Sequence, residues 1–360
     1  MTRRTDTGRR RFLGGLIAAG VIPRPTWADA GSPAYLAAGG RPDGSYLLCG
    51  IGADLSVRFE LPLPARGHAA AAHPSRPQAV AFARRPGTFA LVIDCASGRI
   101  LSTLASPEGR HFYGHGAYSQ AGDLLYTTEN DFTTGTGRIG VWDVTAGYVR
   151  VGEIASGGIG PHDIRRLPGS DTLVVANGGI DTHPDSGRAK LNIPTMAPNL
   201  TYIEAERIVE QAALPKALHK NSIRHLAVGP QGEVALGMQW QGEEPVDALV
   251  GLHRRGSEIT LFDAPAEAVD RMQGYIGSVA CSADGATIAV TSPRGGMVQF
   301  YDTATMALTR SEALEDVCGI APAAQGFTVT TGTGTLRCLR DTAGARASAA
   351  LMWDNHLVAL

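Results

Sequence analysis

The chain has 360 residues, of which 45 are glycine, and a formal net charge of −2 at pH 7. It contains only three lysines and no basic run beyond the N-terminal region, which excludes a typical nucleic-acid-binding protein. No apolar stretch reaches the roughly 20 residues that a transmembrane helix needs, so no membrane anchor is expected.

Residues 1–30 have the three parts of an export signal in order. The charged segment GRRRFLG at 8–14 precedes an apolar stretch at 15–22 and the small residues ADA at 28–30. Paired arginines before an apolar stretch indicate a twin-arginine signal peptide over 1–30, passage through the twin-arginine translocase, cleavage, and a periplasmic mature protein. A basic disordered tail is the alternative interpretation. Because residues 1–30 hold six arginines and two aspartates, their removal changes the formal charge from −2 to −6.

Residues 31–360 follow a repeating all-β pattern. Helical periodicity is nearly absent, and short runs of β-branched and aliphatic residues are separated by turn signals. Predicted strands follow turn glycines and cover residues 124–128, 172–176, 233–238, 287–291 and 327–331. Further segments, such as IGVWD at 139–143 and VQFYD at 298–302, end in polar turns. This pattern is typical of propeller blades.

The repeats count to seven when the two ends of the chain are joined. Seven positions before successive turn glycines lie His115, His162, His225, Ser278 and Gly319, and His68 occupies the equivalent position one repeat earlier. Residues 35–39 align with the second strand of a blade, and residues 355–359 resemble the first strand at 224–228. We therefore predict a seven-bladed β-propeller over 31–360, closed by pairing the C-terminal strand with the N-terminal blade, which leaves no open strand edge.

Five blades in succession place histidine at one register of the strand that lines the channel. Neutral imidazoles that converge from different strands can bind a transition metal such as iron or copper without any local motif. The predicted metal ligands are His68, His115, His162, His225 and His356. The alternative is a wet channel in which these imidazoles hydrogen-bond water and backbone carbonyls.

Polar loops are expected to open on the same face as the histidines. The predicted ligand-binding or partner-binding residues are His111, Glu129, Asp131, Asn177, Asp181, His183, Asp185, Arg188, Lys190 and Arg224. Long ordered loops on rigid scaffolds often carry function. An ordered surface insertion with its own salt bridges is the alternative for residues 181–192.

Catalytic and redox motifs are sparse. The five cysteines form no Cys-x-x-Cys pair, and we expect them to be small buried residues and not disulfides. Neither a nucleophile elbow, nor a phosphate-binding loop, nor a dinucleotide fingerprint occurs. Asp163 and Glu129 could act as acid or base, but no nucleophile accompanies them.

Four segments resemble one known family. They are GRHFYGHG at 109–116, GIGPH at 158–162, NGGIDTHPDSGR at 177–188 and SIRHL at 222–226, and they are similar to the domain of unknown function family 1513. The resemblance implies an exported propeller of the quinoprotein amine dehydrogenase β-chain-like type, without an established activity. It also implies a genomic setting beside imelysin-type lipoproteins and haem proteins of iron uptake. The related nitrous oxide reductase propeller holds a copper cluster on histidines, which is not carried over because Ser278 and Gly319 stand in two blades here.

Three functions follow from these observations. The first is a periplasmic propeller that binds a transition metal or metal complex at a histidine-lined channel mouth and assists iron or copper acquisition, with imelysin-type lipoproteins as partners. The second is a metal-dependent redox enzyme, which a nearby Glu129 or His183 would favour. The third is a non-catalytic interaction scaffold.

Overall fold

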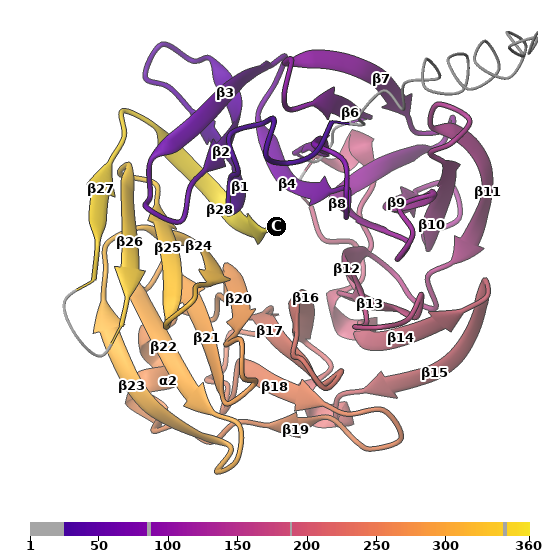
Figure 1. Ribbon diagram of the computed structural model, residues 1–360. Helices are drawn as coiled ribbons and strands as arrows, with labels where there is room; N and C mark the ends of the chain where they lie inside the picture. Colours follow the sequence, from indigo (N-terminus) through magenta and orange to yellow (C-terminus); the bar gives the residue numbers. More distant parts are fainter. Residues whose placement is uncertain (1–24, 85–87, 188, 341–343) are drawn as a thin grey trace, which may run out of the picture.

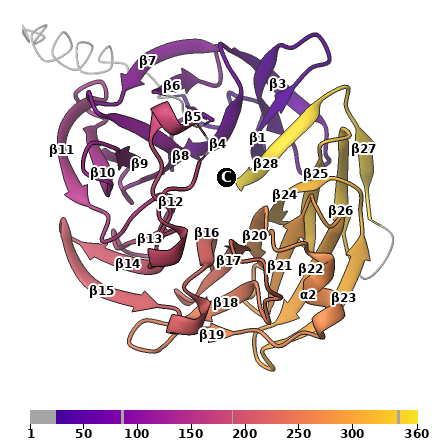
Figure 2. The same cartoon turned by 180° about the vertical axis from the view of Figure 1, so that it is seen from behind.

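The computed structural model describes residues 25–84, 88–187, 189–340 and 344–360. Within them the chain forms seven four-stranded antiparallel sheets arranged around a central axis (Figures 1 and 2). The prediction of an all-β, seven-bladed propeller is confirmed. Most of the predicted twin-arginine signal, residues 1–24, lies outside the described residues.

Each blade runs from an inner strand beside the axis to an outer strand at the rim. The inner strands are β28 (Met352–Ala359), β4 (Gly67–Ala72), β8 (Arg110–Tyr118), β12 (Pro161–Arg166), β16 (Asn221–Val228), β20 (Ser278–Cys281) and β24 (Val317–Pro322). The second strands are β1 (Tyr35–Gly40), β5 (Gln78–Ala83), β9 (Leu124–Asp131), β13 (Leu173–Asn177), β17 (Val234–Trp240), β21 (Thr287–Ser292) and β25 (Phe327–Thr331).

Two further strands complete each blade, and only the outer one is largely exposed to solvent. The third strands are β2 (Tyr46–Ile51), β6 (Phe89–Asp94), β10 (Thr136–Asp143), β14 (Asn199–Glu204), β18 (Val250–His253), β22 (Met297–Asp302) and β26 (Thr335–Leu339). The outer strands are β3 (Val57–Leu63), β7 (Arg99–Ala105), β11 (Val149–Ala155), β15 (Arg207–Ala213), β19 (Thr260–Leu261), β23 (Ala307–Ala313) and β27 (Arg346–Ser348). Helical segments are short: α2 (Ala266–Arg271), η1 (Pro184–Ser186), η2 (Ile193–Thr195) and η3 (Lys216–Leu218).

The ring closes between the two ends of the chain. Strand β28 pairs antiparallel with β1, from Tyr35 opposite Ala359 to Gly40 opposite Met352. The resulting sheet has the order β28-β1-β2-β3, as predicted from the repeat. Closure pairs the inner edge of β1, which would otherwise be open to pairing with another chain.

Apolar side chains fill the spaces between adjacent sheets. Second and third strands are almost continuously buried, whereas outer strands such as β11 are mostly exposed, with Ile154 its one buried residue. All five cysteines are buried and unpaired, which confirms their prediction as small core residues. Among the described residues, none of the helices has the length and apolar composition needed to cross a bilayer.

Candidate metal centre

Five inner strands bring their histidines together at the axis. The axial histidines are His68, His115, His162, His225 and His356, carried by β4, β8, β12, β16 and β28. The His115 ring lies 4.6 Å from that of His356 and 5.1 Å from those of His68 and His162, between ring centroids. The His225 ring is 4.9 Å from that of His162. Residues separated by up to 288 positions in sequence thus form one cluster of imidazoles.

A break in strand pairing occurs at four of these histidines and directly before the fifth, His225, which pairs with Gly237. The register with the second strand shifts between Gly67 and Ala70, Phe112 and Gly116, Pro161 and Asp163, and Ile223 and His225. In β28 the shift lies opposite Ala37 and Gly39. Such β-bulges re-aim side chains next to functional sites. The bulges release the histidines from the strict alternation of side chains on the two faces of a regular strand. The repeat in the sequence does not predict these bulges.

The imidazoles are buried with much of their hydrogen-bonding capacity unused. Four of the axial histidines are at most 7% exposed, and His162 is half-buried. Within the described residues, five ring nitrogens have no hydrogen-bond partner: His115 Nε2, His162 Nδ1, His225 Nδ1, His225 Nε2 and His356 Nε2. A sixth, His68 Nδ1, faces only Asp354 Oδ1, at 3.7 Å. Leaving a buried polar atom unsatisfied costs about 1–3 kcal/mol, so such a cluster calls for a ligand.

Burial favours the neutral, metal-binding state of His68, His162 and His356. Loss of solvation, only partly offset by the carboxylate of Asp354, lowers the pKa of His68 to about 4. The same burial, together with nearby cationic and imidazole groups, holds the pKa of His162 and His356 well below the usual range. A neutral imidazole has a nitrogen lone pair available for coordination.

Two buried carboxylates orient the imidazoles from behind. Asp163 Oδ1 lies 3.1 Å from His115 Nδ1, and Asp354 Oδ1 lies 3.7 Å from His68 Nδ1. Burial would raise the pKa of Asp163, but Arg165 and His115 outweigh it and keep that carboxyl's pKa well below its usual value. A carboxylate behind a histidine fixes its tautomer and strengthens it as a ligand. The sequence showed Asp163 only as a potential acid or base.

Two triplets of axial histidines could hold an ion. In His68, His115 and His162, and in His115, His225 and His356, one ligand atom from each residue lies within 4.8 Å of the others. His115 belongs to both triplets. Because its Nδ1 faces Asp163, only its Nε2 is directed to a metal, and one nitrogen lone pair binds one ion. The arrangement therefore suits a single ion more than a bridged pair.

The lowered pKa values predict acid sensitivity of the metal-free protein. Below pH 6.5 the unfolded chain takes up a proton at His68, whereas the folded protein does so only near its lowered pKa of about 4. The contribution of neutral His68 to the free energy of unfolding is therefore fully present above pH 6.5. It decreases by roughly 3 kcal/mol as the pH falls to 4. Urea unfolding across this range should show the decrease. The His68→Gln variant should show a smaller one, and an equal decrease in the variant would contradict the assignment.

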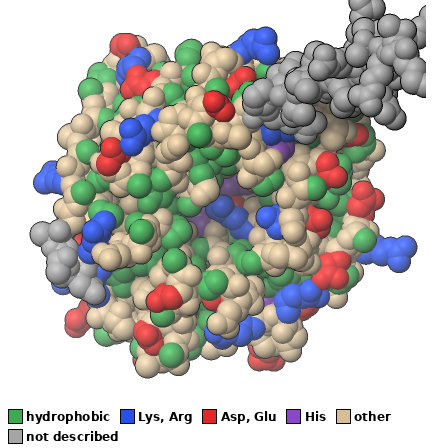
Figure 3. Space-filling view, in the orientation of Figure 1, with side chains coloured by type: hydrophobic (Ala, Val, Ile, Leu, Met, Phe, Trp, Pro, Cys, Tyr) green, Lys and Arg blue, Asp and Glu red, His purple; other side chains and the backbone are tan. Residues whose placement is uncertain are grey.

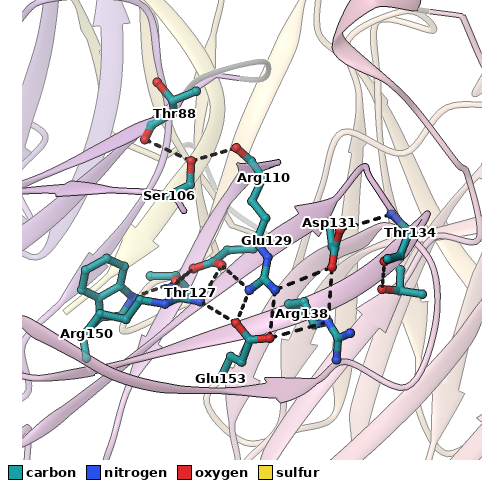
Figure 4. Close-up of polar contacts among 12 residues, drawn as sticks. Thr88, Ser106, Arg110, Thr127, Glu129, Asp131, Thr134, Arg138, Arg150 and Glu153 are labelled. Atoms are coloured by element: carbon teal, nitrogen blue, oxygen red, sulfur yellow. Dashed lines mark hydrogen bonds and ion pairs between the residues drawn. The ribbon is translucent and has the colours of Figure 1, made fainter. Parts of the chain in front are cut away.

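Two predicted site residues lie inside a blade and not beside the histidines. Glu129 is fully buried in β9, where Arg150 Nη1 and Nη2 donate to its two carboxylate oxygens at 2.6 and 3.0 Å (Figure 4). Asp131 lies 3.6 Å from Arg110, which also bonds Glu153. This network ties β8 to β11. Neither acid is among the residues that line the cavity of about 260 Å³ beside the axial histidines, so the geometry gives no support to Glu129 as an acid or base there.

Glu129 is predicted to act on stability alone. The Glu129→Gln change removes the charge that Arg150 compensates and should lower the free energy of unfolding by about 3 kcal/mol, because it leaves the guanidinium half-paired. Metal affinity should stay unchanged. Paired urea-unfolding and metal-titration measurements check both statements. Loss of metal binding in a folded variant would place Glu129 in the metal centre after all.

The loop residues are mostly held by the loop itself. Asn192 Oδ1 accepts from the Asp181 backbone, and its amide donates to Gly179 O. His183 caps η1 by accepting from the Asp185 backbone, while the Asp185 side chain is 91% exposed. Arg188 lies outside the described residues. These contacts agree with an ordered surface insertion.

The other buried predicted residues are likewise structural. Asn177 bonds Ser156 and Asn199 within its blade. His111 faces Asn130 Nδ2 at 3.2 Å. Neither joins the axial histidines.

Two predicted residues do reach the axis. Lys190 and Arg224 line a cavity of about 260 Å³ whose floor includes His68, His162 and His225. Its lining includes Lys190 of the β13–β14 loop and Gly274 and Tyr275, which follow α2. That loop and α2 lie on the face turned toward the reader in Figure 2. Prediction missed two further cationic residues of the cavity wall, Arg84 and Arg294, because they stand in loops with no motif. The opposite face is also hollowed at its centre, where histidine, Lys and Arg side chains gather (Figure 3).

Comparison with known proteins identifies the family. The family model described as "Protein of unknown function (DUF1513)" matches residues 61–360, which include all five axial histidines. The chain belongs to this family. The resemblance seen in the four sequence segments is thereby confirmed. No curated protein matches the chain.

Solved structures resemble this DUF1513 protein in fold. Hydrazine synthase of Kuenenia stuttgartiensis superposes with a TM-score of 0.60 at 14% identity, covering 87% of this chain and 95% of that one. The β-propeller domain of Cps50 (Swd1) from Myceliophteria thermophila gives 0.58 at 13% identity, covering 89% and 93%. At such identities the likeness shows the propeller fold alone.

Proposed function

We propose that this protein binds one transition-metal ion per chain on the axial histidines, as an accessory to iron or copper acquisition. The observation that carries the proposal is the convergence of five imidazoles, four buried and one half-buried, whose ring nitrogens mostly lack hydrogen-bond partners among the described residues. Asp163 and Asp354 back two of these rings. A buried polar cluster of this kind is unfavourable unless a ligand satisfies it. An ion that accepts several nitrogen lone pairs at once meets that need.

The donor set favours particular metals. It consists of imidazole nitrogens, and all five cysteines are buried in the blades, where burial raises the pKa of, for example, Cys318 to about 12. Imidazole suits copper, zinc, nickel and iron, and affinity among divalent ions rises from iron to copper and falls again at zinc. We therefore expect Cu²⁺ to bind more tightly than Zn²⁺ or Ni²⁺, and Fe²⁺ to bind least tightly.

The cellular setting of the proposal rests on the sequence. The twin-arginine pattern in residues 8–14 supports export to the periplasm, and the family resemblance supports a partnership with imelysin-type lipoproteins in iron uptake. An exported metal-binding protein needs no catalytic group, in keeping with the position of Glu129 inside a blade.

Metal analysis of the exported protein tests this function. Mature protein purified from its native periplasm without a histidine tag should contain close to one transition-metal ion per chain by mass spectrometry. Metal-free protein should bind Cu²⁺ saturably in a calorimetric titration. Failure to bind copper, iron and zinc alike would refute the proposal.

The carboxylate behind His115 offers a finer test. In the Asp163→Asn variant, His115 keeps its place but loses the negative charge at its Nδ1, so metal affinity should fall about 10–100-fold. Competition with a chromophoric chelator measures this change. The Asp354→Asn variant should have a smaller effect, because Asp354 Oδ1 lies 3.7 Å from its imidazole and not 3.1 Å. Unchanged affinity in Asp163→Asn would separate that carboxylate from the metal.

A further inference from the structure

The predicted cleavage site of the export signal is part of the folded structure. The chain from Pro25 leads through buried Pro33 directly into β1. Ala30, the residue before the predicted cleavage, is 7% exposed. It belongs to an apolar cluster whose other members come from β1 to β6 and the residue that follows β6. A cleavage site of small residues is recognised through their side chains, and the side chain of Ala30 is covered by the propeller.

Backbone hydrogen bonds fold residues 26–32 into a compact turn, the N-terminal turn. Ala30 N donates to Trp27 O at 3.2 Å, and Ser32 N donates to the same oxygen at 3.0 Å. Gly31 N donates to Ala28 O at 3.1 Å. A protein that binds an extended peptide as an added strand pairs with the main-chain groups of that peptide. Because these groups are already used within the turn, a peptidase must open it before cutting after Ala30.

Trp27 attaches the N-terminal turn to the propeller. Its half-buried ring packs against the apolar cluster that contains Ala30, and its Nε1 donates to His73 O at 3.0 Å. The acceptor is held in place, because His73 is buried and its Nδ1 accepts from the backbone N–H groups of Ser75 and Arg76 at 3.1 and 3.0 Å. Opening the turn therefore exposes part of an aromatic side chain and breaks its hydrogen bond.

We propose that docked Trp27 makes the bond after Ala30 inaccessible in the folded protein, so that a signal peptidase cuts it only when the N-terminal turn opens locally. When the turn closes again faster than the peptidase cuts, the rate of cleavage follows the population of the open form. A chain that folds before export presents the docked form to the peptidase and stays uncut until the turn opens. The proposal rests on the predicted export signal and is independent of metal binding.

Cleavage of the folded full-length chain by purified signal peptidase in detergent, followed by intact mass measurement, tests the proposal. Trp27→Ala should be cut after Ala30 at least about tenfold faster than the unaltered chain, because it loses both the ring contact and the hydrogen bond. Trp27→Phe keeps a ring without the indole N–H and should be cut at an intermediate rate. Equal rates for the three folded chains would overturn the proposal.

Peptides separate docking from recognition by the peptidase itself. Synthetic peptides of residues 20–36, with and without Trp27→Ala, should be cut at equal rates, since neither has a propeller to dock on. A difference between the peptides as large as that between the folded chains would place the effect of Trp27 in the peptidase and overturn the proposal.

Hydrogen exchange checks the docking without a protease. In the full-length chain, the amides of Ala30, Gly31 and Ser32 should exchange at least about tenfold more slowly than in the Trp27→Ala variant. Equal exchange rates in the two chains would overturn the role of Trp27. Copper affinity should be the same in both, so this proposal and the metal proposal can each fail alone.

Discussion

Replacing His115 should abolish tight metal binding. His115 is the residue common to both histidine triplets, and its ring lies within 6.4 Å of those of His68, His162, His225 and His356. Loss of a residue that hydrogen-bonds a metal-binding side chain lowers metal affinity about 10–100-fold. Loss of the metal-binding side chain itself should therefore lower it at least about 100-fold. His115→Gln keeps a polar side chain of similar length and removes the imidazole. Competition titration with Cu²⁺ measures the change.

A histidine outside the cluster provides the control. His183 lies in the loop near the mouth and caps η1, so His183→Gln should leave copper affinity within about twofold of the original. Equal affinity of the His115 variant and the unaltered protein would show that the convergence of rings is incidental. In that case the wet-channel interpretation would account for the histidines, and a partner-binding scaffold would become the better function.

Removing the Trp353 side chain should strongly destabilise the propeller. Trp353 is 2% exposed in the closing strand β28 and packs in a cluster with Tyr35, Leu336 and Leu357. Truncation of a buried aromatic residue to alanine costs about 3–5 kcal/mol. The same strand carries His356, so opening the ring also disperses the axial histidines. Urea unfolding should show the loss, and metal affinity should fall with it.

The neighbouring residue makes a matched control. Met352 is 51% exposed on the same strand, so Met352→Ala should change the free energy of unfolding by no more than about 0.5 kcal/mol. Similar losses in the two variants would mean that β28 is sensitive throughout and that core packing at Trp353 is not the cause. A negligible loss in Trp353→Ala would contradict closure by this strand.

The architecture could be predicted because it repeats. Turn glycines at a fixed distance from His115, His162 and His225 set the strand register, and the match of 355–359 to 224–228 located the closing strand. Both features depend on local residue patterns that survive in a single sequence. Burial of the cysteines followed from their positions in strand-like runs.

The surroundings of the histidines could not be predicted in the same way. The β-bulges beside them depend on pairing between strands, which no local pattern encodes here. The contact of Asp163 with His115 joins two blades, and the four cations of the cavity wall come from four blades. The polar neighbours of Glu129 in the sequence predict a loop position for it. Its partner Arg150 lies two strands away on β11, and the two side chains pair inside the blade.

Diffraction from crystals of the copper-loaded protein, measured at the copper absorption edge, tests the central claim most directly. An anomalous peak is predicted on the propeller axis, about 2.0–2.1 Å from His115 Nε2 and from the nitrogens of at least two other axial histidines. A peak anywhere else on the protein, or axial histidines bonded only to water in crystals grown with excess copper, would contradict the account.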